Sequence, residues 1–354
     1  MSNEEVNIAK SVLHNMTDEQ VRAAKRFFDR FSEFKKLTKL HSVYIEGAKT
    51  ALNNTGNGRM YVRYNIDGTV TGRISNSGAS IERGKNGKIG VSFHTLPRES
   101  LDVNIRDYVV APKGHDFITI DMKAMELRVL AHVANEQNMI KAFSSGVDLH
   151  SYSAGLTFKK KPEDVTKLER QIAKEVSFLT VYGGTAFTLA SKRNIPEERA
   201  EEIINSWLSA FPGVGRYMNT IQEYIEQFKY AKTIFGRRRN LPNIDSPFKG
   251  VRREAFRQGL NFTIQSAASD ILLCGMLGVI EKLKGMQAKV VATVHDSIEL
   301  IAPKDETREV VKIVKDELEN YHYLKDNFNI QLKVPLGVDV EVGSSFGNGV
   351  EYKL

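Results

Sequence analysis

The chain has one cysteine and no long run of apolar residues. The single cysteine, Cys274, excludes a disulfide framework within the chain, and its apolar helical setting predicts a small buried side chain. No apolar run reaches the length of a membrane span. The first residues, MSNEEVNIAK, lack the basic and apolar regions of a signal peptide and are acidic, unlike a transit peptide. These absences favour a reducing, cytoplasmic compartment and argue against a membrane partner.

The composition is that of an ordinary globular protein with a moderate excess of positive charge. Of the 354 residues, 41% are hydrophobic and 26% are charged, and 50 Lys and Arg face 43 Asp and Glu, which gives a net charge of +7. There is no internal repeat or low-complexity tract. The excess of cations suits a polyanionic partner, although many basic proteins bind no nucleic acid.

One stretch, FITIDMKAMELRVLAHVA at 117–134, organises the chain. Its first four residues are apolar and β-branched, which predicts a buried strand that ends on Asp121, and the following apolar residues recur at helical spacing. A carboxylate at the end of a buried strand is poorly solvated, and a divalent metal ion would relieve the cost of its desolvation. The structural alternative is a helix N-cap, a common role for aspartate at a strand-to-helix turn.

A second carboxylate lies in KVVATVHDSIELIA at 289–302. Two short apolar runs flank His295, Asp296 and Ser297, a pattern that predicts a tight hairpin with His295 and Asp296 at its tip. Two aspartates at strand tips of one sheet could bind two Mg²⁺ ions and align an attacking and a leaving oxygen for phosphoryl transfer.

A helix predicted over 162–182 places Arg170, Lys174 and Phe178 at intervals of four residues, within one stripe of about 80°. Pro162 with Glu163 and Asp164 indicates its start. The stripe presents two cations and a ring, the layout that a nucleoside triphosphate needs, whereas spaced cations alone would indicate a solvated face.

These three stretches resemble motifs A, C and B of the family A (Pol I-like) DNA polymerases. Motif A is matched by D-x-x-x-x-E-L-R-x-L-A-H, motif B by R-x-x-x-K-x-x-x-F-x-x-x-Y-G and motif C by V-H-D. The resemblance implies an α+β right-hand fold with an antiparallel palm sheet, inserted helical fingers and a short thumb remnant. The implied division is a thumb remnant at 1–50, palm at 51–135 and 251–354, and fingers at 136–250.

The resemblance also implies a role for each matched residue. Asp121 and Asp296 would hold two Mg²⁺ ions, with Mn²⁺ as a possible substitute and the Met122 carbonyl as a further ligand. Arg170, Lys174 and His150 (of DLHSYSAGLTF, 148–158) would lie at the triphosphate, with Lys174 also placed to protonate the leaving group. Glu126 would be the steric gate against a ribose 2′-hydroxyl, Phe178 would pack on the sugar and Tyr182 beside the template-side base.

Further segments resemble the family's primer–template contacts. They are T-G-R-I-S with Arg73, I-F-G-R-R-R-N-L-P with Arg237, and a helix predicted over 251–284 with Arg257, Asn261 and Gln265 on one face. His295 of motif C belongs to the same group. For Arg237 a solvated loop is an equally good interpretation on sequence alone. A Gly- and Lys-rich insertion at 77–93 predicts a loop or small hairpin.

The function implied is that of a nucleotidyltransferase in DNA replication: template-directed addition of deoxynucleotides (dNTPs) to a primer 3′ end, in a bacterial or phage-infected cell. Two departures stand out. Ser297 replaces the glutamate of the usual V-H-D-E, which predicts reduced or retuned activity rather than none. Only about thirty residues precede the segment that resembles the last thumb helix (31–45). We therefore expect no proofreading domain. The alternatives are one half of a split polymerase, with its thumb, exonuclease or processivity subunit on another chain, or a non-catalytic primer–template binding subunit.

Overall fold

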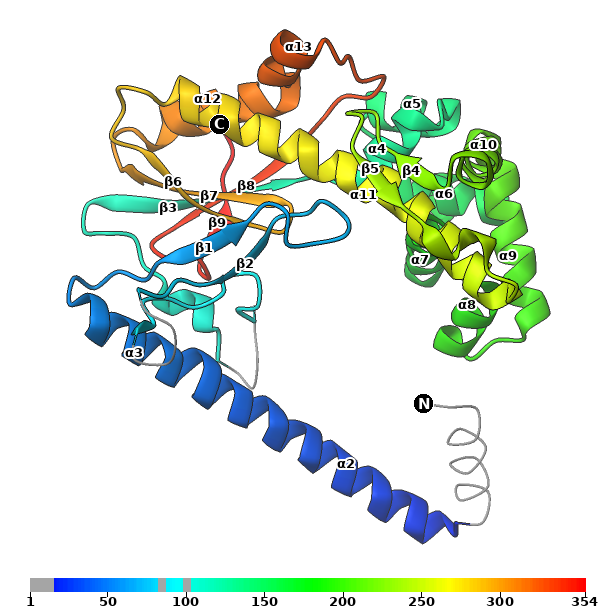
Figure 1. Cartoon of the computed structure of the whole chain (residues 1–354), viewed down its shortest axis with the longest axis horizontal. Helices are drawn as coiled ribbons and strands as arrows, with labels where there is room; N and C mark the ends of the chain where they lie inside the picture. The colour runs from blue at the N-terminus through cyan, green and yellow to red at the C-terminus, as the bar shows by residue number, and fades with distance from the viewer. Residues whose placement is uncertain (1–15, 82–86, 98–102) are drawn as a thin grey trace. The chain divides into compact units, whose positions relative to one another are not determined.

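The computed structural model describes residues 16–81, 87–97 and 103–354, which fall into two compact units (Figure 1). The first unit comprises the residues up to Arg63 together with Asn76–Asp107, and the second comprises Tyr64–Ser75 and Tyr108–Leu354. The chain passes between them through β1 (Val62–Asn65) and β2 (Ser75–Gly78), which form a two-stranded sheet.

In the first unit, apolar residues at helical spacing predict a helix over 17–50, and helical structure is present from Asp18 to Thr55. Thr17 caps α2 (Asp18–Lys39) in a capping box with Gln20, as its position predicts, and a π-helical stretch at Leu40–Ile45 leads into α3 (Glu46–Thr55). Gly56 ends α3 in the left-handed conformation, with φ of +62°. The middle of the predicted 77–93 insertion, 82–86, lies outside the described residues, and its flanks are joined by an antiparallel bridge between Ser80 and Lys88.

The apolar stripe on α2 predicts an ordinary amphipathic core helix, and this prediction is wrong. None of its residues is buried against the described part of the chain, and Phe27, Phe28 and Phe34 are more than 60% exposed. Phe27 instead contacts Phe28 and stacks on Phe31 of the same helix. Helical spacing of the apolar residues was sufficient to predict a helix. It did not show what covers them, and no described residue buries this stripe.

The second unit is built on a five-stranded antiparallel sheet in the order β6-β7-β3-β8-β9. Its central strand β3 (His115–Met122) pairs on one side with β7 (Ser297–Pro303) and on the other with β8 (Val338–Gly343). The edge strands are β6 (Lys289–Val294) and β9 (Val350–Glu351). The antiparallel sheet and the predicted hairpin at 289–302 are confirmed. Alternating apolar residues predict a half-buried strand over 334–347. The strand itself is limited to β8, but the predicted alternation is present from Val334, because Val334, Leu336, Val338 and Val340 are all buried.

Helices follow β3 in the chain, and Figure 1 shows most of them in a block at one end of the sheet and the others along one of its sides. Their bounds are α4 (Met125–Val133), α5 (Gln137–Ser144), α6 (Leu149–Phe158), α7 (Lys167–Val181), α8 (Ala186–Arg193), α9 (Glu197–Ala210), α10 (Pro212–Phe228), α11 (Lys249–Lys282), α12 (Thr307–Asn320) and α13 (His322–Phe328), with 3₁₀ turns at Ile105–Tyr108, Pro162–Asp164 and Pro242–Asp245 and a small hairpin of β4 (Tyr230–Lys232) and β5 (Arg238–Asn240). The helical block α4–α10 therefore lies between β3 and β6 in the chain, as the inserted fingers require.

The long helix α11 corrects the expectation that no segment is apolar enough to span a membrane. Its 34 residues include an 18-residue window of mean hydropathy 1.5. However, 72% of that window is buried inside the protein, so α11 is a core helix. Figure 1 shows it running from the sheet to the helical block. Cys274 lies on this helix and is buried with a free thiol, as its setting predicts.

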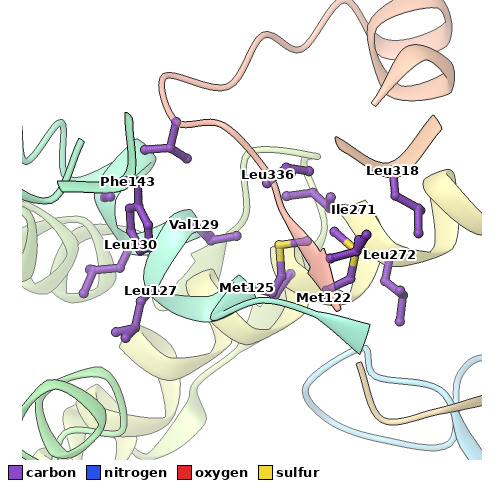
Figure 2. Close-up of a cluster of buried hydrophobic side chains, with 14 of the residues drawn as sticks. Met122, Met125, Leu127, Val129, Leu130, Phe143, Ile271, Leu272, Leu318 and Leu336 are labelled. Carbon is purple, nitrogen blue, oxygen red and sulfur yellow. The ribbon is translucent and has the colours of Figure 1, made fainter. Parts of the chain in front are cut away.

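The hydrophobic core of the second unit joins β3, α4 and α11. Met122 and Met125 flank the strand-to-helix turn and lie beside Ile271 and Leu272 of α11 (Figure 2). Each of these four side chains is at most 5% exposed. The end of β3 that carries Asp121 is therefore fixed from behind by close packing, which limits the positions that the carboxylate can take.

Candidate active site

The two predicted metal ligands lie at neighbouring strand ends. Asp121 of β3 is directly opposite Ser297, the first residue of β7, and Asp296 occupies the turn between β6 and β7. The Met122 amide donates to the Asp296 carbonyl at 3.1 Å, which fixes the turn against β3. His295 adopts the left-handed conformation, with φ of +58°, in that turn. The N-cap interpretation of Asp121 is wrong, because the N-cap of α4 is Ala124.

Arg73 reaches Asp296 and Glu126 from the predicted T-G-R-I-S segment. This segment is a turn before β2, and Gly72 has φ of +73°, which favours glycine. A Cβ on Gly72 would lie 2.6 Å from the Ser266 hydroxyl of α11, so glycine also permits the close approach to that helix. The Arg73 guanidinium then donates to Glu126 at 2.6 Å and lies 3.4 Å from Asp296.

Glu126 is a buried carboxylate, 5% exposed, that receives two donors. One oxygen accepts from Arg73, and the other accepts from the Tyr182 hydroxyl at 2.7 Å. Burial and the bond to Glu126 raise the pKa of Tyr182 to about 12, so the hydroxyl remains a donor at neutral pH. Glu126 of motif A, Tyr182 of motif B and Arg73 thus form one network.

The predicted stripe on α7 is present. The helix begins at Lys167 with a capping box of Thr166 and Glu169, so the predicted start at Pro162 is wrong and Pro162–Asp164 forms a separate 3₁₀ turn. Val176 on the opposite face is fully buried, while Lys174 is exposed to solvent.

Rings extend this stripe toward the end of α7. Phe178 stacks with Tyr182 at a centroid distance of 6.4 Å and lies 6.2 Å from the His150 ring. A cavity of about 320 Å³ opens beside them between α7 and α8, lined by Gln171, Lys174, Glu175, Phe178, Leu179, Tyr182, Thr188, Leu189 and Lys192.

Asp148, which the sequence did not single out, holds the predicted phosphate ligand Arg170. Two guanidinium nitrogens donate to the Asp148 carboxylate at 2.8 and 3.0 Å. Burial raises the pKa of Asp148, but hydrogen bonds from Arg170 and Ser151 outweigh it and hold that pKa well below its usual range. Burial of His150 lowers its pKa to about 4, so its ring is neutral at pH 7.

The face of α11 predicted to contact primer and template bears Arg257, Asn261 and Gln265. Arg257 is paired with Glu254 on the same helix, and Gln265 is buried and interacts with Tyr182. Asn261 Oδ1 and the hydroxyl of Ser266 are buried without a hydrogen-bond partner among the described residues, as is His150 Nδ1. Buried polar atoms are nearly always satisfied, so each of these atoms is available to a bound water or a polar ligand.

Arg237 is exposed but is held by an ion pair. It lies in the turn between β4 and β5 and donates to Asp270 of α11 at 2.6 Å. Asp270 is 8% exposed and was not singled out by the sequence. Asp270 could have been found from the sequence, because a polar residue inside an apolar helix is buried and needs a partner.

The carboxylates fit a hard divalent cation. Asp121 and Asp296 offer oxygen ligands on adjoining segments, and the Met122 backbone lies between them through its bond to Asp296. Over the described residues there is no cluster of three His, Cys, Asp or Glu that could hold a metal by itself. Mg²⁺ suits such an open arrangement, because it is usually bound by one or two carboxylates and completes its shell with water and substrate phosphates.

Comparisons with known proteins point to one family. The profile of DNA polymerase family A matches residues 2–348. The thermostable DNA polymerase I of Thermus thermophilus is 32% identical over 329 residues, which is 93% of this chain and 37% of the relative. The DNA polymerase I of Chloroflexus aurantiacus is 33% identical over 317 residues, 88% of this chain and 31% of the relative. The chain thus spans about a third of the length of these relatives.

A solved structure shares the fold. The POL domain of Pol1 from M. smegmatis, in complex with DNA primer-template and dNTP, matches with a TM-score of 0.74 and 29% identity, over 85% of this chain and 50% of that chain. The polymerase right-hand fold predicted from the motifs is therefore confirmed. Polymerases of the matched family generally use divalent metal ions.

Proposed function

Because the chain belongs to the family A DNA polymerases, we propose that it adds deoxynucleotides to the 3′ end of a primer under the direction of a template. The observation that carries this proposal is the convergence of motifs A, B and C on one site. Asp121 and Asp296 adjoin across β3 and β7, and Tyr182 reaches Glu126 from α7. The substrates are primer–template DNA and a dNTP, by analogy with the bound structure from M. smegmatis.

We assign the reacting groups as follows. Asp121, Asp296 and the Met122 carbonyl are the protein ligands for two Mg²⁺ ions. When bound, these ions lower the pKa of the primer 3′-hydroxyl and neutralise the charge that develops on the leaving pyrophosphate. Lys174 is exposed on α7, where its ammonium can bind a phosphate and donate a proton to the leaving group.

Around these groups, other side chains bind and orient the nucleotide. Arg170 exchanges Asp148 for a phosphate, and the neutral His150 can donate an N–H there. The Phe178 ring packs on the sugar, and Glu126 excludes a 2′-hydroxyl from the adjoining space. Primer and template are contacted by a further group of polar and charged side chains: Arg73, Arg257, Asn261, Gln265, His295 and Arg237.

We assign residues 51–135 and 251–354, which include the five-stranded sheet, to the palm. Residues 136–250 form the fingers, and residues 1–50 form a thumb remnant. We place the protein in the cytoplasm of a bacterium or a phage-infected cell. Two other functions compete: the catalytic half of a split polymerase, and a primer–template binding subunit without catalysis. The paired aspartates favour the catalytic functions, since binding DNA requires no such arrangement.

The test is primer extension by the purified chain on a primed template with Mg²⁺. Asp121→Asn and Asp296→Asn should each lower the rate by at least about a thousandfold, because each removes a metal-ligand charge, and should leave duplex binding within about threefold. Asp339→Asn is the matched control: Asp339 is opposite Asp121 on β8, but it is exposed and paired with Lys123, so its rate should not change. Extension near the wild-type rate by either aspartate variant would refute the assignment.

No extension by the wild-type chain, combined with normal primer–template binding, would favour the binding subunit. Extension that requires a second chain would favour the split polymerase.

A further inference from the structure

A buried glutamate two residues beyond the motif C serine lies beneath the two aspartates. Glu299 of β7 is 0% exposed, which is unusual for a carboxylate unless it has partners. Its Oε1 accepts from the Ser297 hydroxyl at 2.5 Å, and its Oε2 accepts from the Thr119 hydroxyl at 2.6 Å. Glu299 thereby joins β7 to β3.

The strand register puts these bonds on the same face as the proposed metal ligands. Thr119 is opposite Glu299, and Asp121 is opposite Ser297. Side chains of opposed pairs two residues apart share one face of a sheet, so all four side chains lie on one face. The intervening pair, Ile120 and Ile298, is on the other face and is fully buried in the core.

Ser297 also connects Glu299 to the turn that carries Asp296. The Ser297 hydroxyl contacts the Val294 carbonyl at 2.8 Å, and the Thr293 hydroxyl donates to the Ser297 carbonyl at 2.8 Å. These bonds close the turn from 293 to 297 around Asp296. A continuous series of hydrogen bonds therefore runs from this turn through Ser297 and Glu299 to Thr119, two residues before Asp121.

We propose that Glu299 is a positioning residue: with Ser297 and Thr119 it clamps the Asp296 turn onto β3 and so fixes the separation and orientation of the Asp121 and Asp296 carboxylates. This inference rests on the proposed polymerase function for its kinetic consequences, but the clamp itself acts on the two aspartates whether or not the chain extends a primer. Residues that orient metal ligands typically affect metal affinity or activity by about 10–100-fold.

Two substitutions separate the hydrogen bonds from the charge. Glu299→Gln keeps an acceptor for Thr119 and supplies an N–H that Ser297 can accept, so it should stay within about threefold of wild type. Glu299→Leu removes both bonds and should weaken Mn²⁺ binding and lower kcat, each by about 10–100-fold. The dNTP KM and primer–template Kd should not change, because neither ligand contacts Glu299.

The measurements are Mn²⁺ titration of the full chain by electron paramagnetic resonance, steady-state extension kinetics and thermal unfolding. Glu317→Leu is the matched control, because Glu317 is another buried carboxylate with a backbone donor, Tyr323, and an ion pair to Lys282 on α11. It should lower the melting temperature without changing Mn²⁺ affinity. If Glu299→Leu does not fold, Thr119→Val removes one bond with little change in volume and should give a smaller loss of the same kind.

Three results would overturn the clamp: wild-type Mn²⁺ affinity and kcat in folded Glu299→Leu, equal losses in the Gln and Leu variants, or an equal loss of Mn²⁺ affinity in Glu317→Leu. If the wild-type chain binds Mn²⁺ but does not extend a primer, the proposed function fails, and the Mn²⁺ titrations still decide the clamp.

Discussion

At the scale of single residues, Glu126 is the side chain that contacts two other predicted segments of the site. A carboxylate that is 5% exposed would be costly without partners, and Arg73 and Tyr182 supply two. The Tyr182 hydroxyl holds the carboxylate on one side, so the position of Glu126 depends on α7. If Glu126 excludes a 2′-hydroxyl as proposed, both Glu126 and Tyr182 should control that exclusion.

Glu126→Ala should raise incorporation of ribonucleotides relative to deoxynucleotides by at least about tenfold, equivalent to about 1.4 kcal/mol. Tyr182→Phe keeps the ring but removes the bond to Glu126, so it should give a smaller increase in the same direction. Single-nucleotide kinetics measure both. Tyr217→Phe is the control, because its hydroxyl bonds to Thr263 instead, and it should leave discrimination unchanged. Unchanged selectivity in both test variants would show that Glu126 is not the gate.

His150 should make the folding stability sensitive to acid. Its pKa falls to about 4 in the folded state because burial disfavours the imidazolium, against about 6.5 when unfolded. Between these values the unfolded chain binds a proton that the folded chain does not, so stability falls as the pH drops from 6.5 toward 4. From pH 7 to 5 this contribution amounts to ~1–2 kcal/mol. Denaturant unfolding of wild type and His150→Asn should show this difference, and a difference independent of pH would contradict it.

The residues that the sequence singled out and those that it missed differ in a physical way. Asp121, Asp296 and Lys174 were found because a motif or a helical period exposes them. Glu299 was missed because its position in a strand suggests nothing until the register with β3 is known. Ser297 was interpreted as the loss of a carboxylate, whereas the structure places the Glu299 carboxylate in contact with its hydroxyl.

At the scale of elements, periodicity predicted which segments are helices and strands, but tertiary packing decided how they are used. The strand at 117–121, the hairpin at 289–302 and the helix over 251–284 were predicted from local patterns alone. The exposure of α2 and the burial of α11 were not, because a pattern of apolar residues does not identify the partner that covers it. Register and partner choice are properties of the folded chain.

The packing of α11 against α10 gives a prediction for this element. A Cβ on Gly259 would lie 2.5 Å from the Ile225 side chain and 2.7 Å from that of Leu241, and both of these residues are buried. Gly259→Val should therefore destabilise the protein by ~1–3 kcal/mol through overpacking. Gly250→Ala, on the same helix with open space around its Cβ, should instead be stabilising by ~0.5–1 kcal/mol. Chemical denaturation measures both, and a neutral Gly259→Val would show that the two helices can separate.

At the scale of the whole molecule, many cations proposed to meet the substrate are paired with carboxylates in the absence of DNA. Arg73 is paired with Glu126, Arg170 with Asp148, Arg237 with Asp270 and Arg257 with Glu254. Each of these arginines therefore offers phosphates less positive charge at first contact than a free arginine would. Binding must exchange one partner for another, and part of the electrostatic gain is offset by the ion pair that is lost.

Arg237 tests this exchange, because its guanidinium is 43% exposed while Asp270 beneath it is nearly buried. If Arg237 contacts a phosphate, Arg237→Ala should reduce the slope of log Kd against log salt concentration by ~0.9, the contribution of one neutralised phosphate. Asp270→Asn removes the competing charge and should strengthen binding at low salt with the slope unchanged. Arg199→Ala on α9 is the control, since Arg199 is an exposed cation paired with the neighbouring Glu202 and has no proposed contact with DNA. Fluorescence anisotropy with a primer–template between 50 and 300 mM salt measures all four proteins. Equal slopes in the wild type and Arg237→Ala would place Arg237 outside the DNA path and leave its pairing with Asp270 as a structural contact between the β4–β5 hairpin and α11.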